Sequence, residues 1–196
     1  MRLLLVRHAE TACTLERRYC GSADLPLCPQ GIAHARSSAA ALRGELKAAL
    51  SDVRRVYVSP LARCRHTARI FFPDKELVEV PDFREIDFGV FEGRTADELF
   101  ADAELRAAYQ AWVDSYCELP VPGGESKQAF CRRVRASFRS VLAAERNSGI
   151  IVLVAHGGTN MALLEAFASE RRAYWEWGMG AAEWALVPVT AVHSGG

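Results

Sequence analysis

The sequence predicts an α/β fold: a three-layer sandwich in which helices flank a mostly parallel central sheet. Short apolar runs alternate along the chain with longer segments whose apolar residues recur at helical spacing. The length of 196 residues matches one domain, residues 1–196. The composition, 50% hydrophobic and 24% charged residues, is that of a globular protein and excludes a disordered or fibrous chain.

The first half of the chain alternates predicted strands with predicted helices. Residues 3–6 form a buried strand, which Arg7 and His8 follow. Residues 29–50 form a helix, because apolar residues recur at positions 32, 35, 39, 42, 46 and 50. A strand over 55–59, a helix over 61–71 and a strand over 77–80 come next.

The second half begins with two long helices, predicted over 96–116 and 125–145. The prolines and glycines of residues 119–124 separate them, because both residue types break helices. Residues 150–155 are the most hydrophobic strand, 159–168 a helix behind it, and 184–189 the last strand. On the 96–116 helix, Leu105, Tyr109, Trp112 and Tyr116 form a stripe that either packs as core or lines a pocket.

The charge and the cysteines limit the possible partners. Basic and acidic residues balance at 24 each, so we expect neither a nucleic-acid nor a membrane partner. No apolar run approaches the roughly 18–20 residues of a membrane span, and the first run is too short for a secretory signal, which predicts a cytoplasmic protein. The six cysteines lack a C-x-x-C pair and zinc-site spacing, so we expect reduced thiols. The arginines at 132, 133, 135 and 139 predict a solvated helix face.

Polar residues follow several of the predicted strands directly. Arg7 and His8 follow the first strand, Ser59 ends the second, and His156 and Gly157 follow residues 150–155. In an open α/β sheet, ligands bind outside the carboxyl ends of the strands. We therefore expect these residues to meet at one edge of the sheet, although the sequence separates them widely.

Ordered motifs occur from residue 3 to about residue 160. They are Arg7-His8-Ala9-Glu10-Thr11, Gly21-x-x-Asp24, Ser59-Pro60-Leu61-x-Arg63, Arg84-Glu85-x-Asp87-Phe88-Gly89, Pro122-Gly123-Gly124-Glu125-Ser126 and His156-Gly157-Gly158. Together they resemble the histidine phosphatase superfamily, the phosphoglycerate-mutase-like proteins. Ala9 replaces the usual glycine of the first motif, so its loop must accept ordinary dihedral angles.

The resemblance implies a metal-independent phosphomonoesterase that works through a phosphohistidine intermediate. His8 is then the nucleophile, and Glu85 protonates the leaving oxygen before it takes a proton from water. The guanidinium groups of the arginines supply the positive charge, so the resemblance implies neither a metal nor a cofactor. The residues implied to bind phosphate are Arg7, Thr14, Cys20, Gly21, Arg63, His156 and Gly157, of which Arg7, Arg63 and His156 also count as catalytic.

The resemblance leaves the substrate and the final reaction open. The partner is a small-molecule phosphate ester, and a homodimer is possible. The motif at residues 122–126 and the compact length are most similar to members that act on alpha-ribazole 5′-phosphate. Phosphoglycerate mutases and sugar-bisphosphate phosphatases share much of the pattern, and a catalytically silent binding module is the alternative from another class. A helical insert, about residues 94–122, follows the Glu85 loop and is expected over the active site.

Overall fold

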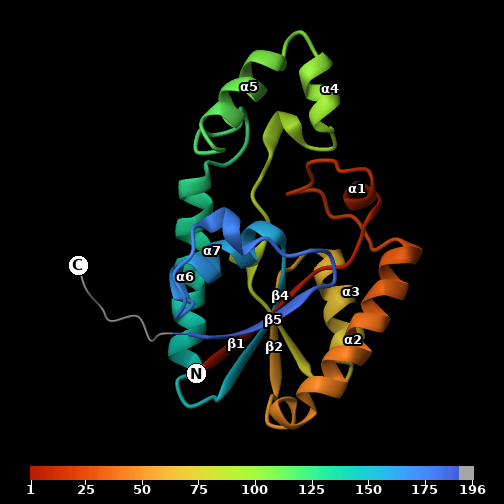
Figure 1. Cartoon of the computed structure of the whole chain (residues 1–196), viewed down its shortest axis with the longest axis vertical. Coiled ribbons are helices and arrows are strands. Elements are labelled where there is room, and N and C mark those ends of the chain that lie inside the picture. Colours follow the sequence, from red (N-terminus) through yellow and green to blue (C-terminus); the bar gives the residue numbers. More distant parts are fainter. Residues whose placement is uncertain (190–196) are drawn as a thin grey trace, which may run out of the picture.

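A five-stranded sheet forms the centre of the protein in the computed structural model, which describes residues 1–189 (Figure 1). The strands are β1 (Arg2–Arg7), β2 (Arg55–Val58), β3 (Glu76–Glu79), β4 (Ile150–Ala155) and β5 (Trp184–Pro188). Their order is β3-β2-β4-β1-β5, and only β5 runs antiparallel to its neighbour. The mostly parallel sheet predicted from the sequence is therefore confirmed.

Helices cover both faces of this sheet and complete the three layers (Figure 1). The long helices are α2 (Pro29–Leu50) and α3 (Ala62–Phe71) on one face, and α6 (Lys127–Ala144) and α7 (Gly157–Phe167) on the other. Alternate residues of β1 belong to the two cores: Leu3 and Leu5 pack with α6 and α7, and Leu4 and Val6 with α2 and α3. Burial on both faces explains why the parallel strands are continuous apolar runs.

Short helical turns occur in the connections that surround the sheet. They are α1 (Ala12–Leu15) and the 3-10 turns η1 (Pro81–Phe83), η2 (Gly89–Phe91) and η3 (Tyr174–Trp177). Within residues 1–189, no helix combines the length and the hydropathy that crossing a membrane requires.

The insert differs from its prediction, because the helix expected over 96–116 is broken into α4 (Ala96–Ala101) and α5 (Arg106–Asp114). Asp102 has an extended backbone with ψ of 119°, and its carboxylate accepts hydrogen bonds from the N–H groups of Glu104 and Leu105. Such a local side-chain turn competes with the helix and ends it.

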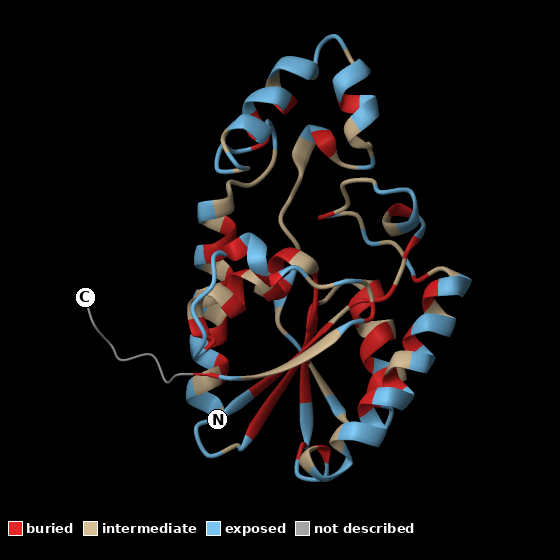
Figure 2. Ribbon diagram, viewed as in Figure 1, coloured by how far each residue is buried: buried red, intermediate tan, exposed pale blue. Residues whose placement is uncertain are grey.

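The aromatic residues of the insert form a small core of their own. Tyr109 and Trp112 are buried against Phe91, Leu99 and Val121. Figure 2 shows this buried inner side beneath exposed helix faces. Tyr116 lies beyond α5 and is 78% exposed, so it does not continue the stripe. Tyr109 and Trp112 therefore pack as core, which is one of the two alternatives that the sequence left open for this stripe.

Candidate active site

The polar residues predicted to converge do meet at the carboxyl edge of the sheet. The ring centroids of His8 and His156 are 5.1 Å apart, and Ser59 Oγ lies 2.7 Å from His156 Nε2. A cavity of about 400 Å³ opens there. Its lining residues are Arg7, His8, Thr11, Thr14, Arg17, Arg18, Tyr19, Cys20, Arg63, Glu85 and Phe88.

His8 is held with one ring nitrogen free. Its Nδ1 lies 2.8 Å from the carbonyl oxygen of Ala9, which can only accept, so Nδ1 carries the proton and Nε2 keeps its lone pair. The φ of Ala9 is not positive, so alanine fits the loop at the position where the motif usually has glycine. Burial, helped by the charges of Arg63 and Arg7, lowers the pKa of His8 to about 3. His8 is therefore a neutral imidazole at physiological pH.

The low pKa of His8 can be tested directly. In the ligand-free protein, the ring carbon shifts of His8 are expected to stay at their neutral values from pH 7 down to about pH 4.5, because the pKa lies near 3. NMR of protein with labelled histidine, assigned with a His8→Ala variant, measures this. The same ring in the urea-unfolded chain should titrate near 6.5. A midpoint near 6.5 in the folded protein would contradict the burial of this ring.

Of the four arginines that line the cavity, Arg63 and Arg7 are those whose charges act on His8. Arg63 is 2% exposed, and its Nη1 and Nη2 donate to the carbonyl oxygens of Ala23, at 2.6 Å, and Gly21, at 2.9 Å. Arg7 donates from Nη1 to the carbonyl oxygen of Met179. Its Nε is buried without a hydrogen-bond partner among the described residues. An unpaired buried donor is costly, so an anion that accepts from Arg7 would bind favourably here.

His156 lies beside His8 but has both ring nitrogens occupied. Arg63 Nε donates to His156 Nδ1 at 3.3 Å, so His156 Nε2 carries the proton and donates to Ser59. The residue is 0% exposed, and no ring nitrogen is free for phosphate in this arrangement. The phosphate-binding role of His156 stays a prediction, whereas its contact with Arg63 is present.

Glu85 enters the cavity from the loop between η1 and η2. Its carboxylate accepts from the N–H of Gly158 in the first turn of α7, at 2.9 Å, and from its neighbour Ile86, at 3.1 Å. Burial raises its pKa, while these two hydrogen bonds and the charges of Arg63 and Arg7 oppose the rise. Glu85 therefore keeps its proton to a higher pH than an ordinary glutamate.

The contact between Glu85 and Gly158 leaves no room for a side chain. A Cβ at position 158 would lie 2.3 Å from Glu85 Oε1. We expect Gly158→Ala to displace the carboxylate and to lower kcat about 10- to 100-fold, since small misplacements of reacting groups are costly. Steady-state kinetics and thermal melting measure the two effects separately. The control is Gly149→Ala, whose Cβ would meet nothing within 4 Å. Equal kcat values for the two variants would contradict the role of this contact.

The loop after His8 corrects the expectation of reduced thiols. Cys13 and Cys20 form a disulfide, and their Cα atoms are 6.4 Å apart. The chain turns back at Arg17, which has a φ of 55°, and this brings the two cysteines within disulfide reach. Within residues 1–189, the free cysteines are Cys28, Cys64, Cys117 and Cys131. The prediction was wrong for the pair because a spacing of seven residues carries no pairing signal by itself.

A second glycine lets this loop approach the Glu85 loop. A Cβ on Gly21 would collide with the carbonyl oxygen of Ile86, at 1.7 Å. The Glu92 carboxylate then joins the two loops, because it accepts from the N–H groups of Gly21, Ser22 and Phe88. Gly21 thus serves the close packing of the loops, and the structure shows it outside the lining of the cavity.

The aromatic residues at the cavity were not identified from the sequence. Tyr19 and Phe88 line it, with ring centroids 5.2 Å apart, and Trp112 packs behind both rings. Phe88 lies within a recognised motif, but Tyr19 has no sequence signal. Trp112, which belongs to the insert and is 6% exposed, therefore packs on Tyr19 and Phe88 and is not among the residues that line the cavity.

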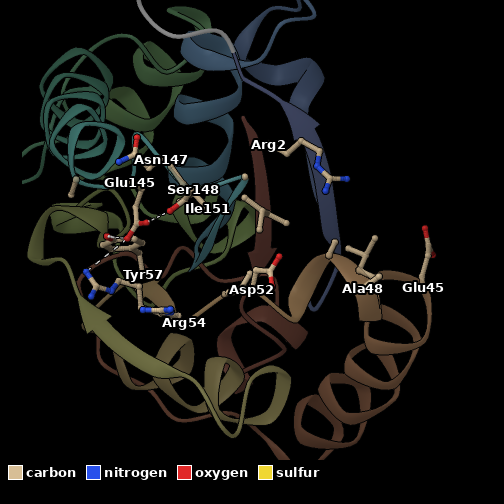
Figure 3. Close-up of a pocket in the computed structure, with 17 residues that line it drawn as sticks. Arg2, Glu45, Ala48, Asp52, Arg54, Tyr57, Glu145, Asn147, Ser148 and Ile151 are labelled. Carbon is tan, nitrogen blue, oxygen red and sulfur yellow. Dashed lines mark hydrogen bonds and ion pairs between the residues drawn. The ribbon is translucent and has the colours of Figure 1, made fainter.

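A larger cavity, about 1070 Å³, lies at the amino ends of the parallel strands (Figure 3). Arginines and acidic residues mix in its wall, and the Tyr57 hydroxyl donates to Glu145 at 2.8 Å. No histidine lines it. Since open α/β sheets bind ligands at the carboxyl ends of their strands, we assign the chemistry to the smaller cavity.

Comparisons with known proteins identify the family of the chain. The family profile of the histidine phosphatase superfamily (branch 1) matches residues 3–192. The chain is 37% identical over 161 residues to the adenosylcobalamin/alpha-ribazole phosphatase of Salmonella typhimurium, covering 81% of this chain and 75% of the relative.

Two solved structures show the same fold. The alpha-ribazole phosphatase of Shigella flexneri has a TM-score of 0.83 and 27% identity, over 97% of this chain and 91% of that one. A phosphoglycerate mutase of Thermus thermophilus has a TM-score of 0.68 and 32% identity, over 95% and 92%. The chain belongs to the histidine phosphatase superfamily (branch 1), as its motifs predict, and is a phosphatase.

Proposed function

We propose that this phosphatase hydrolyses small phosphomonoesters through a phosphohistidine on His8, without a metal ion. The observation that carries the proposal is the free Nε2 of a neutral His8 in one cavity with Arg7, Arg63 and Glu85. A neutral imidazole is a nucleophile, and the two arginines supply the positive charge that phosphoryl transfer requires.

The proposed reaction has two steps. His8 Nε2 attacks phosphorus while the ester P–O bond breaks, and Glu85 gives its proton to the departing oxygen. Water then attacks the phosphohistidine, Glu85 takes a proton from that water, and the P–N bond breaks to release phosphate. Arg7 and Arg63 stabilise the charge on the non-bridging oxygens in both steps. Phosphate contacts from Thr14, Cys20, Gly21, His156 and Gly157 belong to the proposal as predictions.

For the substrate we propose alpha-ribazole 5′-phosphate. Tyr19 and Phe88 offer two tilted aromatic rings beside the catalytic groups, and Trp112 supports them from behind. A flat benzimidazole base can stack on such rings, whereas a sugar phosphate or a phosphoglycerate gains nothing from them. The names of two relatives support this choice. A cytoplasmic location and a homodimer remain predictions from the sequence.

A phosphate-release panel tests the proposed substrate. It compares alpha-ribazole 5′-phosphate, 3-phosphoglycerate and fructose 2,6-bisphosphate, each with and without EDTA. We expect the highest kcat/KM for the ribazole ester and no effect of EDTA. Preference for a sugar bisphosphate, or conversion of 3-phosphoglycerate to its isomer, would contradict the proposed substrate. Loss of activity with EDTA, restored by a divalent cation, would contradict the metal-free mechanism.

A further inference from the structure

The guanidinium of Arg133, on α6, donates to the segment that carries Glu85 and to the carboxylate of Glu125. The arginine run on α6 was predicted to be solvated, but the Arg133 side chain is only 16% exposed. Its bonds are Nε to Glu125 Oε1 (2.9 Å), Nη1 to Asp82 O (2.6 Å) and Arg84 O (3.0 Å), and Nη2 to Glu85 O (3.0 Å) and Glu125 Oε2 (2.8 Å). Arginine has five N–H donors, so these five bonds use them all.

The main-chain acceptors lie just before Glu85 in the sequence and include the carbonyl of Glu85 itself. Glu125, the side-chain partner, is tied to the same segment, because its N–H donates to the carbonyl oxygen of Asp87 at 2.9 Å. The guanidinium also lies over the buried ring of Phe130, with Cζ 4.9 Å from the ring centroid. A planar guanidinium held in this way fixes the backbone around Glu85. The ammonium group of a lysine cannot make the same set of hydrogen bonds.

Glu85 is thus held at two ends. Its carboxylate meets the N–H of Gly158 on α7, and its main chain meets Arg133 on α6. We propose that Arg133 is a positioning residue, which sets the Glu85 carboxyl at the leaving oxygen by clamping the loop backbone; this inference rests on the proposed function. Among the hydrogen bonds that Arg133 makes within residues 1–189, only the one to the Glu85 carbonyl joins it to a residue that lines the cavity, and this bond carries its proposed effect on the reaction.

The test compares leaving groups in Arg133→Ala and Arg133→Lys. We expect the phosphorylation step with ribose 5-phosphate to slow about 100-fold in Arg133→Ala, as misplacing a catalytic acid predicts. With p-nitrophenyl phosphate, whose leaving group needs no proton, the pre-steady-state burst should slow less than about threefold. Methylguanidinium at a non-denaturing concentration should restore part of the ribose 5-phosphate rate. The control is Arg132→Ala, an exposed neighbour on the same helix, which should match the wild type.

If Arg133 only stabilised the fold, its replacement would lower the fraction of folded protein. The rates with both substrates would then fall equally, which would overturn the proposal. Unchanged rates in both variants would overturn it as well. If Arg133→Ala does not fold, the leaving-group ratio of Arg133→Lys decides alone. Failure of the proposed function is a separate result, because the wild type would then form no phosphoenzyme with either substrate.

Discussion

Replacing His8 by alanine is expected to lower kcat by about 10⁴-fold or more, the scale on which removal of a covalent nucleophile acts. His8, whose Nε2 is free, lines the same cavity as Glu85, and both ring nitrogens of His156 are occupied by Ser59 and Arg63. No second imidazole is therefore ready to replace the first. Turnover of p-nitrophenyl phosphate measures the loss, and circular dichroism checks that the fold is kept.

The matched control for this variant is His66→Ala. His66 lies on α3, outside the lining of the cavity, so its replacement should leave kcat within about twofold of the wild type. Turnover of His8→Ala within tenfold of the wild type would mean that water attacks the ester directly and that His8 has another role.

The second large effect is expected for Glu85→Gln, which should slow the phosphorylation step with alkyl phosphates about 10²- to 10⁴-fold. An alkoxide is a poor leaving group and needs the Glu85 proton, whereas p-nitrophenolate leaves without it. The amide oxygen of glutamine can still accept from the N–H of Gly158, so the loop should keep its place. Rapid-quench kinetics with ribose 5-phosphate and p-nitrophenyl phosphate measure the two rates, and a nitrophenol burst is expected in the variant.

The pH dependence of the wild type provides an independent check on Glu85. The acid must be protonated to act, and burial raises its pKa, so the alkyl phosphate rate should fall as pH rises through that raised pKa. This alkaline limb should vanish in Glu85→Gln and persist in Glu79→Gln, which replaces an exposed glutamate at the end of β3. If Glu85→Gln slowed the phosphorylation step equally with alkyl phosphates and with p-nitrophenyl phosphate, Glu85 would instead bind phosphate or hold the loop.

Most of the sheet could be predicted from the sequence, because burial on both faces requires continuous apolar runs. β4 illustrates this, since all of its residues are buried and its bounds, Ile150–Ala155, match the prediction. The broken helix in the insert could not be predicted from periodicity. Its break at Asp102 depends on a side chain that bonds to its own backbone two and three residues ahead.

Topology predicted the site residues at the ends of strands, and the motifs predicted Arg63 and Glu85, whereas residues outside both were missed. Arg7, His8 and His156 follow parallel strands, and topology alone brings them together. Tyr19 enters the cavity from a loop that the Cys13–Cys20 disulfide closes, and nothing in the spacing of these residues indicates it. Arg133 looks like its solvated neighbours in the sequence, and only the path of the Glu85 loop reveals its contacts.

Trapping the phosphoenzyme shows directly whether His8 is the nucleophile. The enzyme is mixed with phosphate-labelled p-nitrophenyl phosphate, quenched in alkali within milliseconds, digested and mapped by mass spectrometry. We expect one phosphoryl group per chain on His8 Nε2, stable in alkali and lost in acid, which reaches its maximum during the nitrophenol burst. Label on another residue, or turnover without any label on His8, would contradict it.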